Sequence, residues 1–322
     1  MSNGLNAIQD DLVDPDIRRF VDAINAAYVA HAAPAGSDMT TRRAVAERVR
    51  KPWREDGPIM AESVDMDMNG IRLRLHRPVA DAVLPVMLYI HGGGWTLFSI
   101  DTHDRLMREY SARAGIAVVG IDYSLSPEHK FPVALNECSA ALDWIAANAA
   151  RLGLDAERVL IGGDSAGANL SVATCLLRRD AGRSLPAAMI LNYGAFAPEH
   201  TPSYARFGQG DYSLEADEMD VFWDNYVAEP AQLNNPLVAP LRADLAGLPP
   251  AFLAIAECDI LADSNHAFAA RLTDARVATE SQVYAGATHS FLEAMSIAPL
   301  AAHALDDQAA WIGRTIGHVA PV

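Results

Sequence analysis

One short segment of the chain places a serine between closely spaced glycines. Gly163-Asp164-Ser165-Ala166-Gly167 directly follows the apolar run 159–161 and precedes a stretch with helical periodicity. Flanking glycines allow a sharp turn from a strand into a helix, so the serine hydroxyl projects outward, and the helix amino terminus favours developing negative charge. The pattern predicts Ser165 as a nucleophile. A glycine-rich turn with a bystander serine is the structural alternative.

A second glycine-rich segment supplies the groups that such a nucleophile needs. His91-Gly92-Gly93-Gly94-Trp95 directly follows the apolar run 86–90. Preorganised backbone amides stabilise the oxyanion of a tetrahedral intermediate. We expect the amides of Gly93, Gly94 and Ala166 to be these donors. His91, at the root of the loop, is predicted to be a hydrogen-bonding strut rather than a catalytic base.

A serine hydroxyl becomes nucleophilic when a neutral imidazole accepts its proton and a carboxylate orients that imidazole. Where a strand–serine–helix turn carries the nucleophile, the acid and then the histidine follow it along the chain. Asp259 comes just after the apolar run 252–256, and His289 just after the run that ends at Tyr284. Both would therefore lie at strand ends beside Ser165. Glu257 and Asp263 compete for the acid, although Asp263 is expected on the following helix.

The elements around these residues indicate an α/β-hydrolase fold. The segment 62–75 alternates in polarity around Asn69-Gly70, which is typical of a β-hairpin. Stretches of helical period, among them 138–150 and 168–179, separate short apolar runs, as in parallel sheets with helical crossovers. We expect an eight-stranded, mostly parallel sheet with helices on both faces, whose later strands are the runs 86–90, 116–121, 159–162, 188–192, 252–256 and 281–284.

Two regions interrupt this alternation. Helical stretches at 17–30 and 41–50 precede any strand, and 195–229 is rich in aromatic residues. Ligand sites commonly lie between such layers, so we expect a helical cap; a solvent-facing decoration without substrate contact is the alternative. The predicted organisation is a cap segment at 1–55, a catalytic core at 56–194 and 231–322, and a cap insertion at 195–230.

Composition excludes several classes of protein. The 322 residues carry a formal net charge of −16, which argues against nucleic acid or an anionic membrane surface as partners. No apolar run approaches membrane-spanning length and residues 1–16 do not resemble a leader, so we expect a cytoplasmic protein. The three cysteines lack a Cys-x-x-Cys pair and are interpreted as buried thiols. The chemistry calls for no metal or organic cofactor.

These motifs together resemble those of the hormone-sensitive-lipase-like carboxylesterases, also called bacterial family IV esterases. Residues 91–95 match the family's HGGGW, 163–167 its GDSAG, and 122–132 resembles its DYRLAPEHKFP segment. The resemblance runs from about Ile59 to the carboxyl terminus. It differs at Ser124 and Ser126, in a DxL element at 259–263 without the usual proline, and in 289–291, which reads HSF rather than HGF.

The resemblance implies Ser165 as nucleophile, Asp259 as acid, His289 as base, and Gly93, Gly94 and Ala166 as oxyanion donors. It further implies hydrolysis of small esters with short acyl chains, and dimers are common in the family. The run 281–284 is a candidate edge strand for such a homodimer, although edge strands are equally often covered.

Two rival functions remain open. An amidase or peptidase on the same fold needs the same three side chains but must also protonate a poorer leaving group. A non-catalytic ligand-binding protein, similar to the plant hormone receptors that resemble this family, would lack the histidine that is present here as His289.

Overall fold

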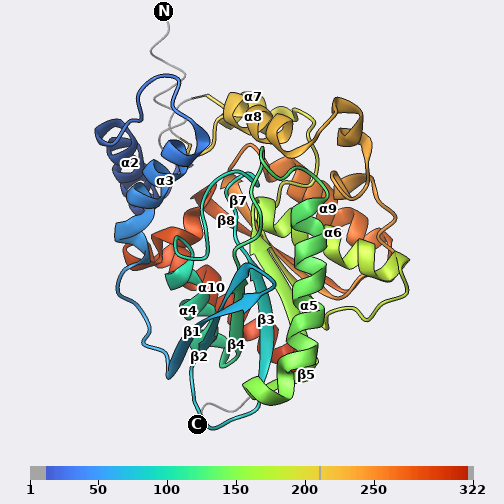
Figure 1. Ribbon diagram of the computed structural model, residues 1–322. Coiled ribbons are helices and arrows are strands. Elements are labelled where there is room, and N and C mark those ends of the chain that lie inside the picture. The colour runs from blue at the N-terminus through green and yellow to red at the C-terminus, as the bar shows by residue number, and fades with distance from the viewer. Residues whose placement is uncertain (1–11, 210–211, 318–322) are drawn as a thin grey trace, which may run out of the picture.

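The computed structural model describes residues 12–209 and 212–317 and contains one eight-stranded sheet (Figure 1). The five strand pairs from β4 to β8 are parallel, whereas β2 is antiparallel to both of its neighbours. This confirms the predicted fold class. In sheet order the strands are β1 (Glu62–Met68), β2 (Ile71–Arg77), β4 (Ala117–Ile121), β3 (Leu84–Ile90), β5 (Leu154–Asp164), β6 (Ala188–Asn192), β7 (Ala251–Cys258) and β8 (Thr279–Thr288).

The hairpin at the start of the sheet forms where the Asn-Gly pair predicts it. Asn69 and Gly70 both have positive φ, 54° and 90°, as a two-residue hairpin turn requires. The Gly70 N–H donates to Oδ1 of Asp67 at 3.1 Å, and Met68 pairs with Ile71 across the turn. The turn therefore sets the register of β1 against β2.

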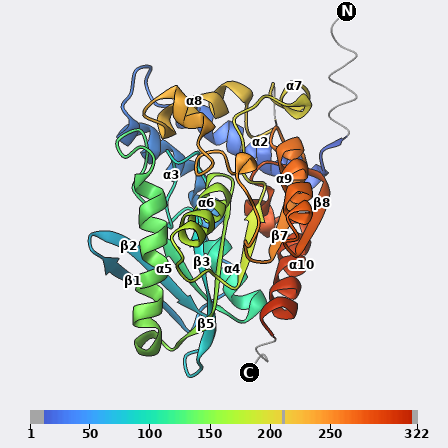
Figure 2. The same cartoon turned by 90° about the vertical axis from the view of Figure 1, so that its right-hand side faces the viewer.

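The central strands are buried on both faces. Every residue of β3, β4 and β6 is buried, which explains why these strands read as continuous apolar runs. Helices α5 (Val133–Leu152) and α6 (Ala166–Asp180) pack together on one face, and α4 (Asp104–Ala114) and α10 (Pro299–Ile316) on the other (Figure 2). Helix α9 (Ala262–Asp274) packs against β7 and β8.

Four helices lie above the carboxyl ends of the strands in Figure 1: α2 (Pro15–Ala30), α3 (Met39–Arg54), α7 (Pro202–Phe207) and α8 (Ala216–Tyr226). Asp14 caps the amino terminus of α2, where its Oδ1 accepts from the N–H of Asp16 at 2.9 Å, and Pro15 is the first residue of the helix. The two helices predicted before the first strand are confirmed, and each extends beyond its predicted bounds.

The remaining expectations can be compared with the described ranges. Cys138, Cys175 and Cys258 are buried free thiols, as predicted. Strand β8 forms one edge of the sheet and exposes residues 281–283 there, while the homodimer stays a prediction. Among the described residues, no helix is both long and apolar enough to cross a bilayer, and no group of three or more metal-ligating side chains is assembled. Residues 1–11, which begin the predicted cap segment, lie outside the described ranges.

Candidate active site

The chain turns sharply at Ser165, between β5 and α6. Ser165 has φ 53° and ψ −118°, a backbone conformation that is strained for a residue other than glycine. A Cβ on Gly163 would lie 2.2 Å from the carbonyl oxygen of Ile90, and a Cβ on Gly167 would lie 1.9 Å from the same atom. Both glycines are therefore required because the end of β3 passes directly against the turn.

Three side chains from separate strand ends meet at this turn. Nε2 of His289, which follows β8, lies 3.0 Å from Oγ of Ser165. Nδ1 of His289 lies 2.7 Å from Oδ2 of Asp259, which follows β7. All three are at least nine-tenths buried, and the ring of Tyr193 packs edge-on against the imidazole with centroids 5.1 Å apart. The structure thus brings together the three residues that the sequence proposed as nucleophile, base and acid.

The competing carboxylates make other contacts. Oε2 of Glu257 accepts from the N–H of Gly286 at 3.0 Å. Asp263 lies in the first turn of α9, and its Oδ2 accepts from the N–H of Ser203 at 2.8 Å. Asp259 instead uses one oxygen for His289 and the other for the N–H of Leu261 at 3.0 Å. The position of Asp259 just after a strand therefore indicated which of the three carboxylates contacts His289.

Two opposing effects set the proton affinity of His289. Burial lowers the pKa of the imidazole, but the charge of Asp259 and its hydrogen bond outweigh burial, so the pKa of His289 lies above the ordinary 6.5. A carboxylate on Nδ1 favours the proton there, which leaves Nε2 to accept a proton from Ser165. The environment thus strengthens His289 as a base.

The resulting pH dependence is testable. Only the neutral imidazole accepts a proton, so kcat/KM for p-nitrophenyl acetate should rise with pH through an apparent pKa above 6.5. Asp259→Asn removes the charge that raises this pKa, so the midpoint should move to lower pH and the plateau should fall by roughly 10³- to 10⁴-fold. Rate profiles of the two proteins measure both effects. A variant with an unshifted midpoint would contradict the assigned role of Asp259.

The glycine loop 92–94 lies beside Ser165. Gly93 and Gly94 have φ of 108° and 57°, and the carbonyl of Gly93 accepts from the N–H of Leu97 at 2.9 Å, which closes a tight turn. A Cβ on Gly94 would lie 2.2 Å from the ring of Phe222. Ala166 begins α6, where the amides of the first turn lack helical partners. Gly93 lines the same cavity as Ser165, Gly94 is the next residue of the loop, and Ala166 directly follows Ser165 in the chain.

A buried contact between a carboxylate and a histidine, which the sequence did not reveal, lies behind this loop. Oδ1 of Asp164 accepts from the N–H of Gly92 at 3.1 Å and from the hydroxyl of Tyr89 at 2.7 Å. Oδ2 of Asp164 lies 3.4 Å from Nε2 of His103. Burial lowers the pKa of His103, but the charge of Asp164 more than offsets it, so the pKa of His103 is raised. Asp164 therefore ties the glycine loop to the turn that carries Ser165.

His91 is confirmed as part of the support for the loop. Its Nδ1 donates to the carbonyl of Gly92 at 2.7 Å, and its ring stacks on Tyr123 with centroids 4.4 Å apart. Burial and the neighbouring His103 lower the pKa of His91 to about 4, so the ring is neutral at physiological pH. A buried neutral ring in these contacts acts as a strut.

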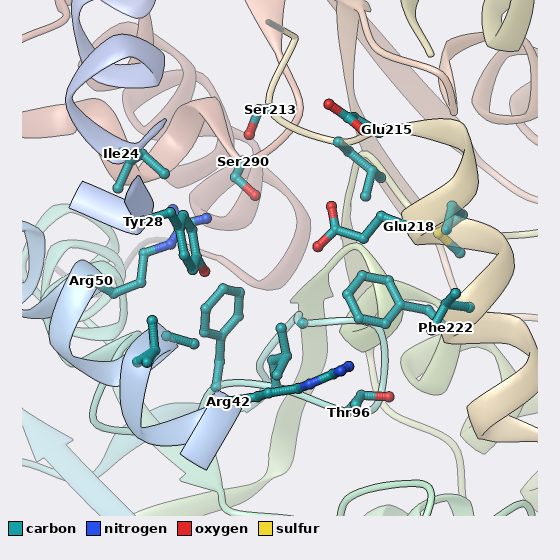
Figure 3. A pocket seen from close by; sticks show the side chains of 18 of the residues that line it. Ile24, Tyr28, Arg42, Arg50, Thr96, Ser213, Glu215, Glu218, Phe222 and Ser290 are labelled. Carbon is teal, nitrogen blue, oxygen red and sulfur yellow. The ribbon is translucent and has the colours of Figure 1, made fainter. Parts of the chain in front are cut away.

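A cavity of about 690 Å³ opens over Ser165, His289 and Gly93. Its walls come largely from helices outside the sheet layer, so these helices are not a solvent-facing decoration. Figure 3 shows several of the side chains that line it: Tyr28 from α2, Arg42 and Arg50 from α3, and Glu218 and Phe222 from α8. None of these five residues could be predicted from the sequence, because no motif or spacing distinguishes them.

Known proteins that are similar to this chain include ester hydrolases. Residues 87–293 match the family model described as alpha/beta hydrolase fold. Carboxylesterase NlhH of Mycobacterium tuberculosis is 38% identical over 233 residues, which cover 70% of this chain and 72% of that protein. Ethyl acetate hydrolase of Pseudomonas putida is 31% identical over 305 residues, 88% of this chain and 93% of that one.

A solved structure with the same fold adds further support. The ester-hydrolase from the Lake Arreo metagenome superimposes with a TM-score of 0.88 at 34% identity, covering 95% of this chain and all of that one. This structure, the two relatives and the family match all point to the family that the motifs at 91–95 and 163–167 resemble. The chain therefore belongs to the hormone-sensitive-lipase-like carboxylesterases of the α/β-hydrolase fold.

Proposed function

We propose that this serine carboxylesterase hydrolyses small, short-chain acyl esters through a triad of Ser165, His289 and Asp259. The observation that carries the proposal is the continuous contact from Asp259 to His289, 2.7 Å, and from His289 to Ser165, 3.0 Å. Both distances lie within hydrogen-bonding reach, as proton transfer requires. The same contacts weigh against a non-catalytic binding protein.

In the proposed mechanism, Nε2 of His289 takes the proton of Ser165 as Oγ attacks the ester carbonyl. Asp259 stays ionised and stabilises the imidazolium. His289 then protonates the departing alcohol, which leaves an acyl group on Ser165. Water, deprotonated in turn by His289, attacks this acyl-enzyme and releases the carboxylic acid together with free Ser165.

The amides of Gly93, Gly94 and Ala166 are the proposed oxyanion donors. Donors fixed before the reaction need no reorganisation when the carbonyl oxygen becomes charged, which is why such holes contribute strongly to the rate. The positive φ values of Gly93 and Gly94 support this role, because they turn consecutive amides of the loop in directions that an ordinary strand would not allow.

We also propose that residues 1–55 and 195–230 act as the cap and that 56–194 and 231–322 form the catalytic core. Helices α2, α3 and α8 belong to the first two ranges and line the cavity above Ser165. The cap would then determine which esters fit. Residues 1–11 and 210–211 of these ranges are not described by the structure.

A panel of p-nitrophenyl esters from acetate through butyrate and octanoate to dodecanoate tests the chain-length preference. A cavity of about 690 Å³ accommodates a small ester, and the relatives include proteins named acetyl esterase and ethyl acetate hydrolase. We expect kcat/KM for acetate or butyrate to exceed that for dodecanoate by at least about tenfold, which corresponds to roughly 1.4 kcal/mol. A maximum at dodecanoate would overturn the short-chain proposal.

The matching p-nitroanilide distinguishes the esterase from the amidase. An amine is a poorer leaving group than a phenolate and must be protonated as it departs. We expect hydrolysis of p-nitrophenyl acetate without measurable hydrolysis of p-nitroacetanilide. Comparable kcat/KM values for the two substrates would favour the amidase.

A further inference from the structure

Glu218 reaches into the active-site cavity from the cap. It lies on α8, and Figure 3 shows its carboxylate directed into the cavity, towards Tyr28 on the opposite wall. The carboxylate is close enough to the catalytic centre to contribute to the raised pKa of His289. The exposed part of the Glu218 side chain faces the water in the cavity, which a bound substrate would displace.

The carboxylate of Glu218 forms no ion pair with any residue that the structure describes. Among the ion pairs formed within residues 12–209 and 212–317, each within 4.0 Å, none involves Glu218. Desolvation by the surrounding protein is the main cause of its raised pKa, and the charges of His289 and Arg50 and a hydrogen bond with the backbone of Glu215 oppose this shift. Glu218 is exposed to the open cavity, so cavity water solvates its carboxylate when no substrate is bound.

Arg50, which also lines the cavity, is paired with Glu293. Nη1 of Arg50 lies 2.9 Å from Oε2 of Glu293, and both side chains are about 6% exposed. The guanidinium carbon of Arg50 also lies 4.9 Å from the ring centre of Phe98 and 5.8 Å from that of Phe20. Glu293 therefore offsets part of the positive charge of Arg50, although the charge of Arg50 still lowers the pKa of Glu218.

Arg42 is the other arginine in the lining and lies apart from Glu218. In Figure 3 its side chain extends from α3 towards Thr96, whereas Glu218 enters from α8 next to Phe222. Glu215 also lines the cavity, and its negative charge offsets one positive charge of the lining. Since Arg50 is paired with Glu293, the other charged lining residues are Arg42 and two carboxylates, of which Glu218 points inward.

Aromatic rings surround the same space. Tyr28, Phe98 and Phe222 all line the cavity with Glu218. A substituted ammonium is attracted both by a carboxylate and by the faces of aromatic rings. An apolar chain in this place would instead remove water from an ionised carboxylate without replacing its hydrogen bonds, which is unfavourable. The lining therefore favours a cationic group over an apolar group of the same shape.

We propose that Glu218 and the rings of Tyr28 and Phe222 form a subsite for an ammonium group, so that the enzyme prefers small esters that carry a cationic group. This inference rests on the proposed esterase function and names the substrate class of the same site. The subsite also offers a reason for a short-chain preference. A long alkyl chain that reached Glu218 would displace the water around its charged carboxylate without replacing the hydrogen bonds of that water.

The test uses pairs of esters that differ only in charge. Acetylcholine is compared with its carbon isostere, in which carbon replaces the quaternary nitrogen, and ethyl trimethylammoniobutyrate is compared with its carbon isostere. These pairs place the cation on the alcohol side and the acyl side, respectively. We expect the wild type to prefer the cationic member of at least one pair in kcat/KM, and Glu218→Gln to lower that preference by about tenfold, or roughly 1.4 kcal/mol.

Asp217→Asn is the matched control. It removes the same charge from the same helix, but Asp217 is exposed and lies outside the cavity lining. The Asp217→Asn variant should prefer the cationic ester over its isostere as strongly as the wild type does. Equal preferences in Glu218→Gln and the wild type, or an equal loss in Asp217→Asn, would overturn the subsite.

A measurement on the wild type covers the case in which Glu218→Gln does not fold. Choline should inhibit hydrolysis of p-nitrophenyl acetate competitively and more strongly than the uncharged alcohol of the same shape; equal inhibition constants would overturn the subsite. Hydrolysis of the uncharged esters reports separately on the proposed function. If the wild type hydrolysed none of the esters, the esterase proposal itself would fail, and this inference with it.

Discussion

Ser165→Ala is expected to lower kcat for p-nitrophenyl acetate by roughly 10⁴- to 10⁶-fold, because removing the nucleophile of a serine hydrolase leaves only binding and oxyanion stabilisation. Oγ of Ser165 is the atom that His289 contacts at 3.0 Å, and no other hydroxyl hydrogen-bonds to that nitrogen among the described residues. Steady-state kinetics, with a correction for uncatalysed hydrolysis, measure the loss.

Ser111→Ala is a suitable control for the loss of a buried serine. Its hydroxyl donates to the carbonyl of Ile116 at 2.9 Å, on α4 and away from the cavity. This variant should lose about 1 kcal/mol of unfolding free energy yet keep wild-type kcat. A loss of less than about tenfold in Ser165→Ala would mean that another group attacks the ester.

Gly93→Ala is expected to lower kcat by roughly 10²- to 10³-fold, the usual effect of losing an oxyanion donor. A Cβ at this position would lie 2.3 Å from the carbonyl oxygen of Leu97, and φ of 108° disfavours any side chain. The loop must therefore move, and the amides of Gly93 and Gly94 move with it. KM should change much less than kcat, because the donors act mainly in the transition state.

Gly182→Ala separates this effect from general backbone strain. Gly182 also has positive φ, 65°, but a Cβ there meets nothing within 4 Å and the residue lies outside the active-site cavity. We expect lower stability with unchanged kinetics. Wild-type kcat in Gly93→Ala would show that the loop does not supply the oxyanion donors.

The sheet and the strand ends could be predicted because they follow from local patterns. Central strands such as β3 and β6 are apolar throughout since helices cover both of their faces, and a residue that follows such a strand must lie at the carboxyl edge of the sheet. The positions of Asp259 and His289 were predicted because each follows such a strand. The start of β5 was not predicted, because residues 154–158 are largely polar and pair with β3 there only through Leu154 opposite Leu84.

The cavity walls could not be predicted in this way. Tyr28, Arg50 and Glu218 come from three helices that meet only after the chain has folded. The pairing of Arg50 with Glu293 and that of His103 with Asp164 join segments that are distant in sequence. A lone charged residue on an amphipathic helix ordinarily indicates a solvated face, so neither residue type nor spacing marks these positions.

Covalent labelling tests the central claim most directly. A fluorophosphonate reacts with an activated serine and remains attached, as the acyl group of a substrate does transiently. Intact-mass analysis of the wild type should show one adduct, which peptide mapping assigns to Ser165, and Ser165→Ala should remain unlabelled. An adduct on a different residue, or equal labelling of Ser165→Ala, would contradict the account.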